Sequence, residues 1–119
     1  MRELTKAFKA LSDETRLRIL SLLLERECCV CEVMQALSIS QTRASRNLGI
    51  LYDAGFLKVR RDGLWALYSI NEEVTKEYLG QLVTIVDKAL SGNETVAGDR
   101  ERLKTAVRVG PGCVRELTK

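Results

Sequence analysis

The middle of the sequence passes from helical to alternating periodicity, and this order permits few folds. A short helical stretch at residues 32–37 is followed, after a two-residue break, by a longer one at residues 40–51. Two alternating segments, 56–61 and 65–70, then flank Asp62-Gly63, which is a strong hairpin signal. Two helices joined by a tight turn and followed by a hairpin predict a winged helix-turn-helix, a mainly α fold with a small β-hairpin wing.

The flanking sequence completes the predicted organisation. The first dozen residues form an amphipathic helix, and Ser12 provides the capping hydroxyl of a second helix that runs to about Glu25. A broad apolar stripe over residues 72–90 predicts a helix that is shared with another subunit, so the expected molecule is a homodimer. We expect one domain over residues 1–91 and a tail over residues 92–119, with one possible helix in the tail from Asp99 to Val107.

The stretch at residues 40–51 has the composition of a DNA recognition helix. Its first turns present short polar and basic side chains, and its other face is apolar. Gln41 and Asn47 suit base edges, Arg43 and Arg46 suit guanine or phosphate, and basic residues on the hairpin suit the DNA backbone or the minor groove. The predicted DNA-binding set is Ser40, Gln41, Thr42, Arg43, Ser45, Arg46, Asn47, Lys58, Arg60 and Arg61.

Composition limits the other classes of function. The net charge of +3 is mild, so the local basic face carries more weight than the total. There is no histidine, no Gly-rich phosphate loop and no pair of carboxylates in a polar setting, so an enzyme is not expected. A thiol-disulfide enzyme fits poorly, because the cysteines do not form a Cys-x-x-Cys at a strand-to-helix junction. We expect neither a signal peptide nor a membrane span, and therefore a cytoplasmic protein with no membrane partner.

Three of the four cysteines fall within four residues, at Cys28, Cys29 and Cys31, and the fourth is Cys113. In a reducing compartment such thiols form a soft-ligand site more readily than structural disulfides. On a regular helix Cys29 and Cys31 would lie about 200° apart, because each residue advances about 100°. If both thiols bound one ion, the helix that carries them would have to unwind locally, and this would disturb the recognition helix beside it.

Several local motifs lie between about Leu4 and Leu90. They are residues 8–20 (FKALSDETRLRIL), Cys29-Val30-Cys31, Ser40-Gln41, Ser45-Arg46-Asn47-Leu48, Ala54-Gly55-Phe56-Leu57, and Arg60-Arg61-Asp62-Gly63 with Tyr68. Through these motifs the stretch resembles the arsenical-resistance repressors of the ArsR/SmtB family. The resemblance implies a homodimer that pairs through its first and last helices and releases double-stranded operator DNA when it binds an inducer. The family commonly has a histidine where this chain has Asn47.

The ligand set indicates the inducer. Trivalent arsenic or antimony takes three thiolates and no imidazole, so As(III) or Sb(III) is expected, and no cofactor is required for DNA binding. The family's zinc, nickel and cobalt sites use histidines that this chain lacks. Some arsenic-sensing relatives have a third cysteine where this chain has Met34, so the third thiolate is either Cys28, which we favour as the nearer, or Cys113. A redox or persulfide sensor, or a cadmium or lead sensor, of the same fold is the alternative.

Overall fold

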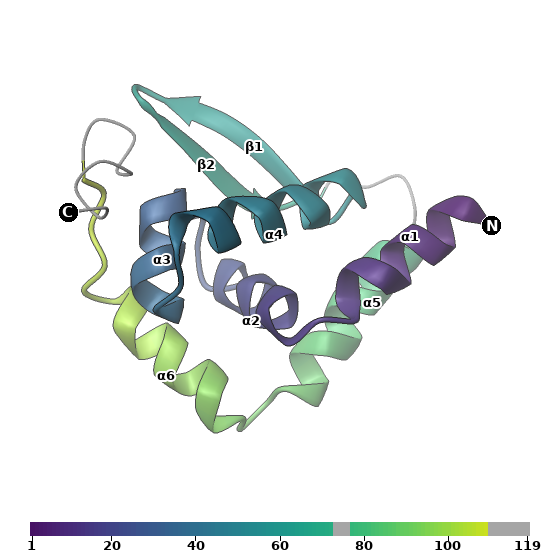
Figure 1. Cartoon of the computed structure of the whole chain (residues 1–119). Coiled ribbons are helices and arrows are strands. Elements are labelled where there is room, and N and C mark those ends of the chain that lie inside the picture. The colour runs from purple at the N-terminus through teal and green to yellow at the C-terminus, as the bar shows by residue number, and fades with distance from the viewer. Residues whose placement is uncertain (73–76, 110–119) are drawn as a thin grey trace.

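The computed structural model describes residues 1–72 and 77–109, and within them it contains six helices and one antiparallel hairpin (Figure 1). This confirms the predicted mainly α, winged helix-turn-helix architecture. Cys113 and residues 73–76 of the predicted helix 72–90 lie outside the described residues. The elements are α1 (Arg2–Leu11), α2 (Glu14–Leu23), α3 (Val30–Leu37), α4 (Gln41–Asp53), β1 (Leu57–Asp62), β2 (Trp65–Ile70), α5 (Glu77–Ala89) and α6 (Glu94–Leu103).

A tight corner joins α1 to α2. The cap of α2 is Asp13 and not Ser12, because the Asp13 carboxylate accepts the Arg16 N–H at 3.1 Å. Ser12 instead ends α1, where its hydroxyl donates to the Lys9 carbonyl at 2.8 Å. Only two residues therefore separate the helices.

The helix-turn-helix consists of α3 and α4. Ser38 ends α3 in the left-handed region (φ +57°), and the Ser40 hydroxyl caps α4 by accepting the Arg43 N–H at 3.2 Å. Gly55, at φ +95°, follows α4 as predicted. The start of α3 at Val30 is two residues earlier than the sequence pattern indicated.

The hairpin pairs Leu57 with Ile70 at its base and Asp62 with Trp65 at its tip. Its two-residue loop is therefore Gly63-Leu64, one position later than the predicted Asp62-Gly63. Gly63 has φ +61°, which suits a turn that places glycine at its first central position.

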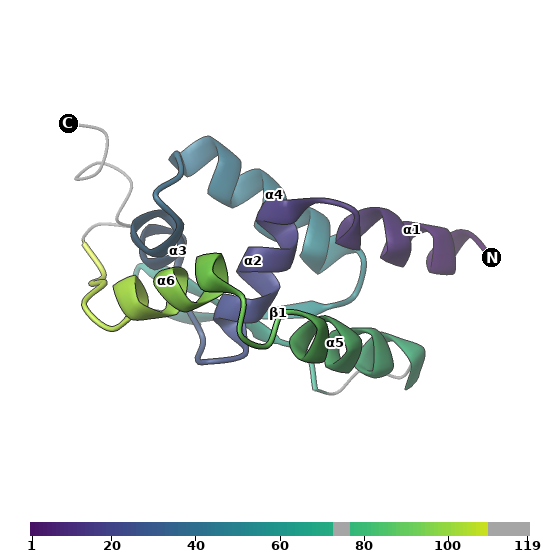
Figure 2. The ribbon, with the colours of Figure 1, turned by 90° about the horizontal axis from the view of Figure 1, so that it is seen from below.

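The core forms around α2, which lies at the centre of the molecule in both ribbon views (Figures 1 and 2). Its Ile19, Leu20 and Leu22 are 0% exposed, as are Leu48 and Leu51 of α4. Each such side chain contributes about 1.5–3 kcal/mol on burial. Within the described residues no helix combines the length and apolar character needed to cross a bilayer.

The helix α6 packs against α2 and α3, although the sequence pattern suggested only a possible tail helix. It begins five residues before the predicted Asp99 and ends at Leu103, four residues before Val107. Asp99 is 1% exposed and binds Arg18 of α2 at 2.7 Å and Arg102 of α6 at 2.8 Å. Both arginines also donate to the last carbonyls of α3, Leu37 and Ala36. Through these contacts α6 fixes the end of the first helix-turn-helix element.

Candidate nucleic-acid interface and thiol site

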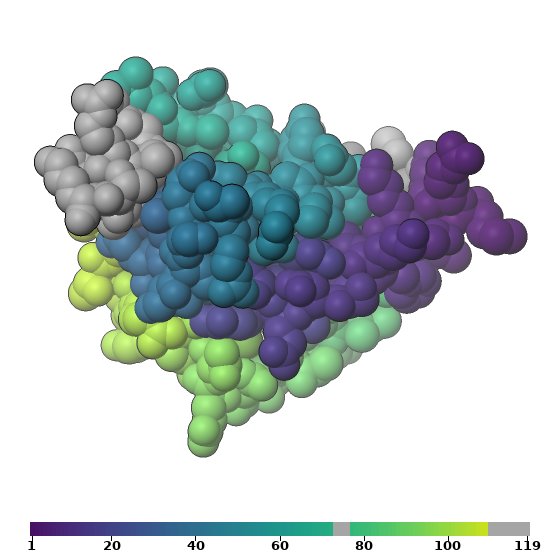
Figure 3. Space-filling model, viewed as in Figure 1, coloured from purple at the N-terminus to yellow at the C-terminus, as the bar shows by residue number. Residues whose placement is uncertain are grey.

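The recognition helix α4 is open to solvent on the face shown in Figure 3. Ser40, Thr42, Arg43 and Arg46 are exposed, and Gln41 and Ser45 are half-buried. The Gln41 amide donates to the Ser45 hydroxyl at 2.8 Å. The opposite side of the helix is fixed in the core by the apolar residues Ala44, Leu48 and Leu51. The N-terminal half of α4 thus offers the short polar and basic surface that a major groove accepts.

Asn47 does not belong to that surface, which corrects the expectation that it pairs with base edges. Its side chain is in the interior, with the residue 4% exposed. The amide oxygen accepts from Arg16 at 2.9 Å, and the amide nitrogen donates to the Arg43 carbonyl at 2.9 Å. Both polar ends are used inside the protein. The signal was in the sequence, because Asn47 lies three residues after Ala44 and four before Leu51 and so shares the helix face of these apolar residues.

Arg43 has a contact inside the protein as well as an exposed side chain. Its guanidinium donates to the Thr15 hydroxyl at 2.8 Å. Thr15 lies in the first turn of α2 and is 7% exposed. A contact of Arg43 with DNA therefore uses its remaining guanidinium donors or a rotated side chain.

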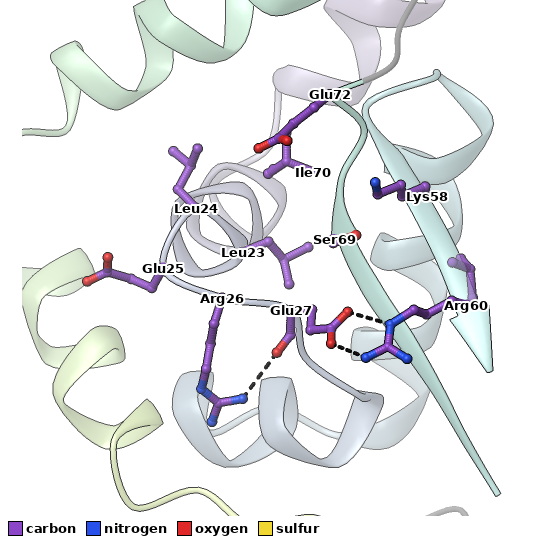
Figure 4. Close-up of a pocket in the computed structure, with 11 residues that line it drawn as sticks. Leu23, Leu24, Glu25, Arg26, Glu27, Lys58, Arg60, Ser69, Ile70 and Glu72 are labelled. Atoms are coloured by element: carbon purple, nitrogen blue, oxygen red, sulfur yellow. Dashed lines mark hydrogen bonds and ion pairs between the residues drawn. The ribbon is translucent and has the colours of Figure 1, made fainter. Parts of the chain in front are cut away.

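The predicted basic residues of the hairpin do not share one face. All three are exposed, but the strand register places Lys58 and Arg60 on one face and Arg61 on the other. Arg60 points toward the loop that follows α2, where it grips the Glu27 carboxylate through Nε at 3.0 Å and through Nη2 (Figure 4). This hydrogen bond from Arg60 lowers the pKa of Glu27. The pair joins the hairpin to the residue that precedes the cysteines.

The cysteines do not lie on one regular helix, which corrects the expected 200° separation. Cys28 is extended and exchanges both backbone hydrogen bonds with Tyr68 of β2, and Cys29 is the N-cap of α3 (φ −85°, ψ 172°). Only Cys31 is inside the helix. The Sγ atoms of Cys29 and Cys31 lie 2.8 Å apart. The two thiols can therefore bind one ion without unwinding α3.

The extended backbone separates Cys28 from Cys29. Successive side chains of an extended segment point to opposite sides. Cys28 thus packs into the main core with Tyr68, whereas Cys29 and Cys31 form a second buried cluster with Leu67. Trp65 and Val109 pack against this second cluster.

Glu32 supports the thiol pair and is not among the site residues predicted from the sequence. The carboxylate accepts the Cys29 N–H at 2.9 Å and the Arg26 guanidinium at 2.8 Å. Burial acts to raise the pKa of Glu32, but the Cys29 N–H and Arg26 outweigh it and the pKa is lowered, so the buried carboxylate is charged. The signal in the sequence is the three-residue spacing from Cys29 to Glu32, which is that of a capping box.

The thiols of Cys28 and Cys29 have unusually weak acidity. Burial raises the pKa of Cys28 and that of Cys29 to about 12. For Cys29 the hydrogen bond with Cys31 acts in the same direction. Both residues are therefore protonated thiols near neutral pH.

The segment after α6 runs along α3 toward the thiol pair. Gln35 exchanges two hydrogen bonds with the backbone of Val107, at 2.7 and 3.1 Å. Arg108 approaches both Glu32 and Asp62 at 3.4 Å, and the Trp65 indole donates to the Val109 carbonyl at 3.3 Å. Val109 thereby reaches the cluster of Cys29 and Cys31. Among the described residues no group of three Cys, His, Asp or Glu side chains is placed to hold a metal ion.

Comparisons with known proteins agree with this architecture. The family model for bacterial regulatory proteins of the arsR family matches residues 13–59. An arsenic resistance transcriptional regulator of Pseudomonas putida is 40% identical over 97 residues, which cover 81% of this chain and 73% of the relative. A cadmium resistance regulatory protein, a CadC homolog of Staphylococcus aureus, is 38% identical over 96 residues, which cover 80% of this chain and 74% of the relative.

Solved structures show the same fold. The transcriptional repressor BigR of Xylella fastidiosa has a TM-score of 0.65 and 29% identity, with 78% of this chain and 88% of that chain covered. A homodimeric winged helix-turn-helix DNA-binding domain of Mycobacterium bovis has a TM-score of 0.64 and 29% identity, with 78% and 82% covered. Members of this family are transcriptional regulators that bind DNA and are not enzymes. The chain belongs to the arsR family of bacterial transcriptional regulators.

Proposed function

We propose that this regulator is a metalloid-responsive repressor. It binds double-stranded operator DNA as a homodimer and leaves the DNA when Cys29, Cys31 and Cys113 bind As(III) or Sb(III). The observation that carries this proposal is the separation of 2.8 Å between the Cys29 and Cys31 sulfurs, at the start of the first helix of the helix-turn-helix. The similarity to the arsenic resistance regulator supports it.

The third thiolate is assigned to Cys113 instead of Cys28. The Cys28 side chain packs in the main core, and its thiol lies 3.5 Å from the Arg26 carbonyl. Val109, by contrast, already contacts the cluster that contains the thiol pair. Cys113 follows four residues later, and four residues span at most about 14 Å, so its thiol is within reach of the pair.

The acid–base state of the site suits a neutral metalloid. Arsenous acid, As(OH)₃, exchanges its three hydroxyl groups for three thiols: three S–As bonds form, three As–O bonds break, and each thiol proton leaves in a water molecule. No net proton is released, so a thiol with a raised pKa imposes no penalty. A divalent cation would instead have to displace each thiol proton into solution.

The position of the site accounts for the effect on DNA. Cys29 and Cys31 contact Leu67 of the hairpin and begin α3, which is followed by α4. A metalloid that binds the Cys113 sulfur together with those of Cys29 and Cys31 applies strain to both α3 and the hairpin. It thereby favours a state in which α4 and the wing no longer fit the operator.

The pairing of two chains is assigned to α1 and α5, which lie at the same end of the molecule (Figure 2). Phe8 of α1 is 54% exposed and Ile85 of α5 is 59% exposed. Leu4 of α1 adds to the apolar surface at 42% exposure. An apolar surface of this kind at one end of a small domain marks a protein interface.

The test is a gel shift on the promoter of the protein's own gene, in a phosphine reductant, with and without arsenite. We expect the wild-type protein to retard the fragment and arsenite to release it. Cys29→Ser and Cys113→Ser should retard the fragment equally but resist release. If the fragment migrates as free DNA in every lane, the proposal that the protein is a repressor of this promoter is ruled out. If arsenite fully releases the fragment from Cys113→Ser, Cys113 is ruled out as the third thiolate.

A second candidate within this fold is a sensor of oxidants, because the same 2.8 Å contact suits a disulfide. Peroxide would convert two thiols to one disulfide and two water molecules. Mass spectrometry of the protein after stoichiometric peroxide separates the two functions. A loss of 2 Da, accompanied by release from DNA at peroxide concentrations below those of arsenite, would favour the oxidant sensor.

A further inference from the structure

Arg16, which is not among the predicted site residues, joins three helices through one guanidinium. From the first turn of α2, its Nε donates to the Ala10 carbonyl at 2.7 Å, and Nη2 donates to the Lys9 carbonyl at 3.1 Å. Both carbonyls belong to the last turn of α1. The remaining nitrogen, Nη1, donates to the Asn47 amide oxygen of α4 at 2.9 Å. A planar guanidinium with donors in fixed directions sets the relative orientation of its partners.

Asn47 completes the connection on the side of the recognition helix. The residue is 4% exposed, and its amide nitrogen donates to the Arg43 carbonyl one turn earlier in α4. A parallel contact joins Arg43 to Thr15, again between α4 and the first turn of α2. The first turn of α2 therefore holds α1 on one side and α4 on the other.

Within the described residues, the apolar contacts of α1 with the core come from its C-terminal half, where Leu11 packs partly buried against the main cluster. The residues that α1 buries are two alanines, Ala7 and Ala10, whose side chains are single methyl groups. Methyl groups pack without preferring one angle of approach. The two-residue corner at Ser12-Asp13 and the hydrogen bonds of Arg16 therefore add the directional constraints on the angle of α1.

We propose that Arg16 and Asn47 are positioning residues that set the distance between the two recognition helices of the dimer, and hence the half-site spacing that the protein accepts in DNA. This inference rests on the proposed function, in which α1 pairs the subunits. If α1 belongs to the dimer interface, its angle to α4 is repeated by the two-fold symmetry in both subunits.

A small tilt of α1 is enough to change the distance between the two recognition helices by more than one base pair. A helix of ten residues is about 15 Å long, so a tilt of about 10° moves its end by about 2.6 Å. The two-fold symmetry doubles this displacement to about 5 Å, which exceeds the rise of about 3.4 Å per base pair. A loosened link would thus let the dimer accept half-sites at more than one spacing, while each helix reads the same bases.

The experiment is selection of duplexes from a random-sequence library by the full-length protein, followed by sequencing. We expect the wild type to enrich inverted half-sites at one spacing. Asn47→Leu, which keeps the side-chain size but removes the amide, and Arg16→Lys, which keeps the charge but loses the planar group, should enrich the same half-site at spacings that spread over about two base pairs. The matched control is Arg46→Lys, an exposed arginine of α4, which should keep the wild-type spacing while binding more weakly.

Each outcome decides the matter. Wild-type spacing in both variants would overturn the inference, and so would a changed base at one half-site position in Asn47→Leu, because Asn47 would then read DNA. If Asn47→Leu fails to fold by circular dichroism, Arg16→Lys alone carries the comparison. A wild-type protein that enriches no paired half-sites would overturn the proposed function itself, and the inference with it.

Discussion

At the scale of single residues, adjacent cysteines have different surroundings. Cys28 packs with the main core, and Cys29 faces the second cluster with Cys31, because the backbone at this point is extended. The sequence showed that thiols gather here and that they suit a thiophilic ligand. It could not show that Cys28 forms a backbone bridge with Tyr68, forty residues away along the chain. This bridge keeps Cys28 and Cys29 off the helix, and the sulfurs of Cys29 and Cys31 thereby come together.

The first prediction concerns Cys28→Ala. Removing a fully buried thiol should lower the free energy of unfolding by about 1–2 kcal/mol, measured with urea, since it leaves a small cavity. The arsenite concentration that releases DNA should not change. A folded variant that no longer responds to arsenite would show that Cys28 is the third thiolate.

The second prediction concerns pH and the identity of the ligand. Cys29 has its pKa raised to about 12, so between pH 6 and pH 8 the thiol keeps its proton until a ligand displaces it. The affinity for cadmium should therefore rise at least about tenfold per pH unit, because at least one proton is released on binding. The affinity for arsenite should stay nearly constant, since its hydroxyl groups take up the thiol protons. Competition with a chromophoric chelator measures the cadmium affinity, and the intrinsic fluorescence of Trp65 measures the arsenite affinity. An arsenite affinity that rises as steeply as the cadmium affinity would contradict the proposed exchange.

At the scale of elements, local patterns predicted most helices and the hairpin, because their apolar spacings and caps are contained within each segment. The predictions fail where contacts with residues distant in the sequence determine where a helix begins or packs. Cys29 is an uncommon N-cap, and Glu32 makes it one by bonding its N–H. The helix α6 has only three buried residues, Val96, Asp99 and Leu103, so its amphipathic pattern is weak. Its position depends on partners in α2 and α3, which no local pattern shows.

The third prediction tests how α6 is held. In Asp99→Ala, Arg18 and Arg102 lose their shared carboxylate. We expect the free energy of unfolding to fall by about 2–3 kcal/mol, less than the 3–5 kcal/mol typical of a wholly buried pair, because these arginines are 24% and 48% exposed. The matched control in the same helix is Glu101→Ala, which removes an ion pair with Lys104 whose side chains are 73% and 70% exposed. Its effect should stay within about 0.5 kcal/mol. Equal losses in the two variants, measured by urea unfolding, would show that Asp99 does not hold α6.

At the scale of the whole molecule, the proposed sensor and the proposed dimer interface lie at opposite ends. The thiol pair begins α3 beside the hairpin, while α1 and α5 lie together at the far end (Figures 1 and 2). The recognition helix α4 spans the distance between them, so both ends can change its fit to DNA. Family motifs indicated these parts from the sequence, but their arrangement around α2 depends on the packed core.

The last prediction tests the interface. Phe8 and Ile85 are 54% and 59% exposed on α1 and α5, so a glutamate at either position places a charge in the interface without disturbing the core of the subunit. We expect Phe8→Glu and Ile85→Glu to sediment as monomers at concentrations where the wild type is a dimer, with unchanged helical circular dichroism. The control is Leu64→Glu in the hairpin loop, which is 62% exposed and should leave the dimer intact. Because a dimer engages two half-sites at once, the monomeric variants should also lose most of their affinity for a two-site duplex and little for a single half-site. Two variants that sediment as wild-type dimers would place the pairing surface elsewhere, and the link between α1 and half-site spacing would then lose its basis.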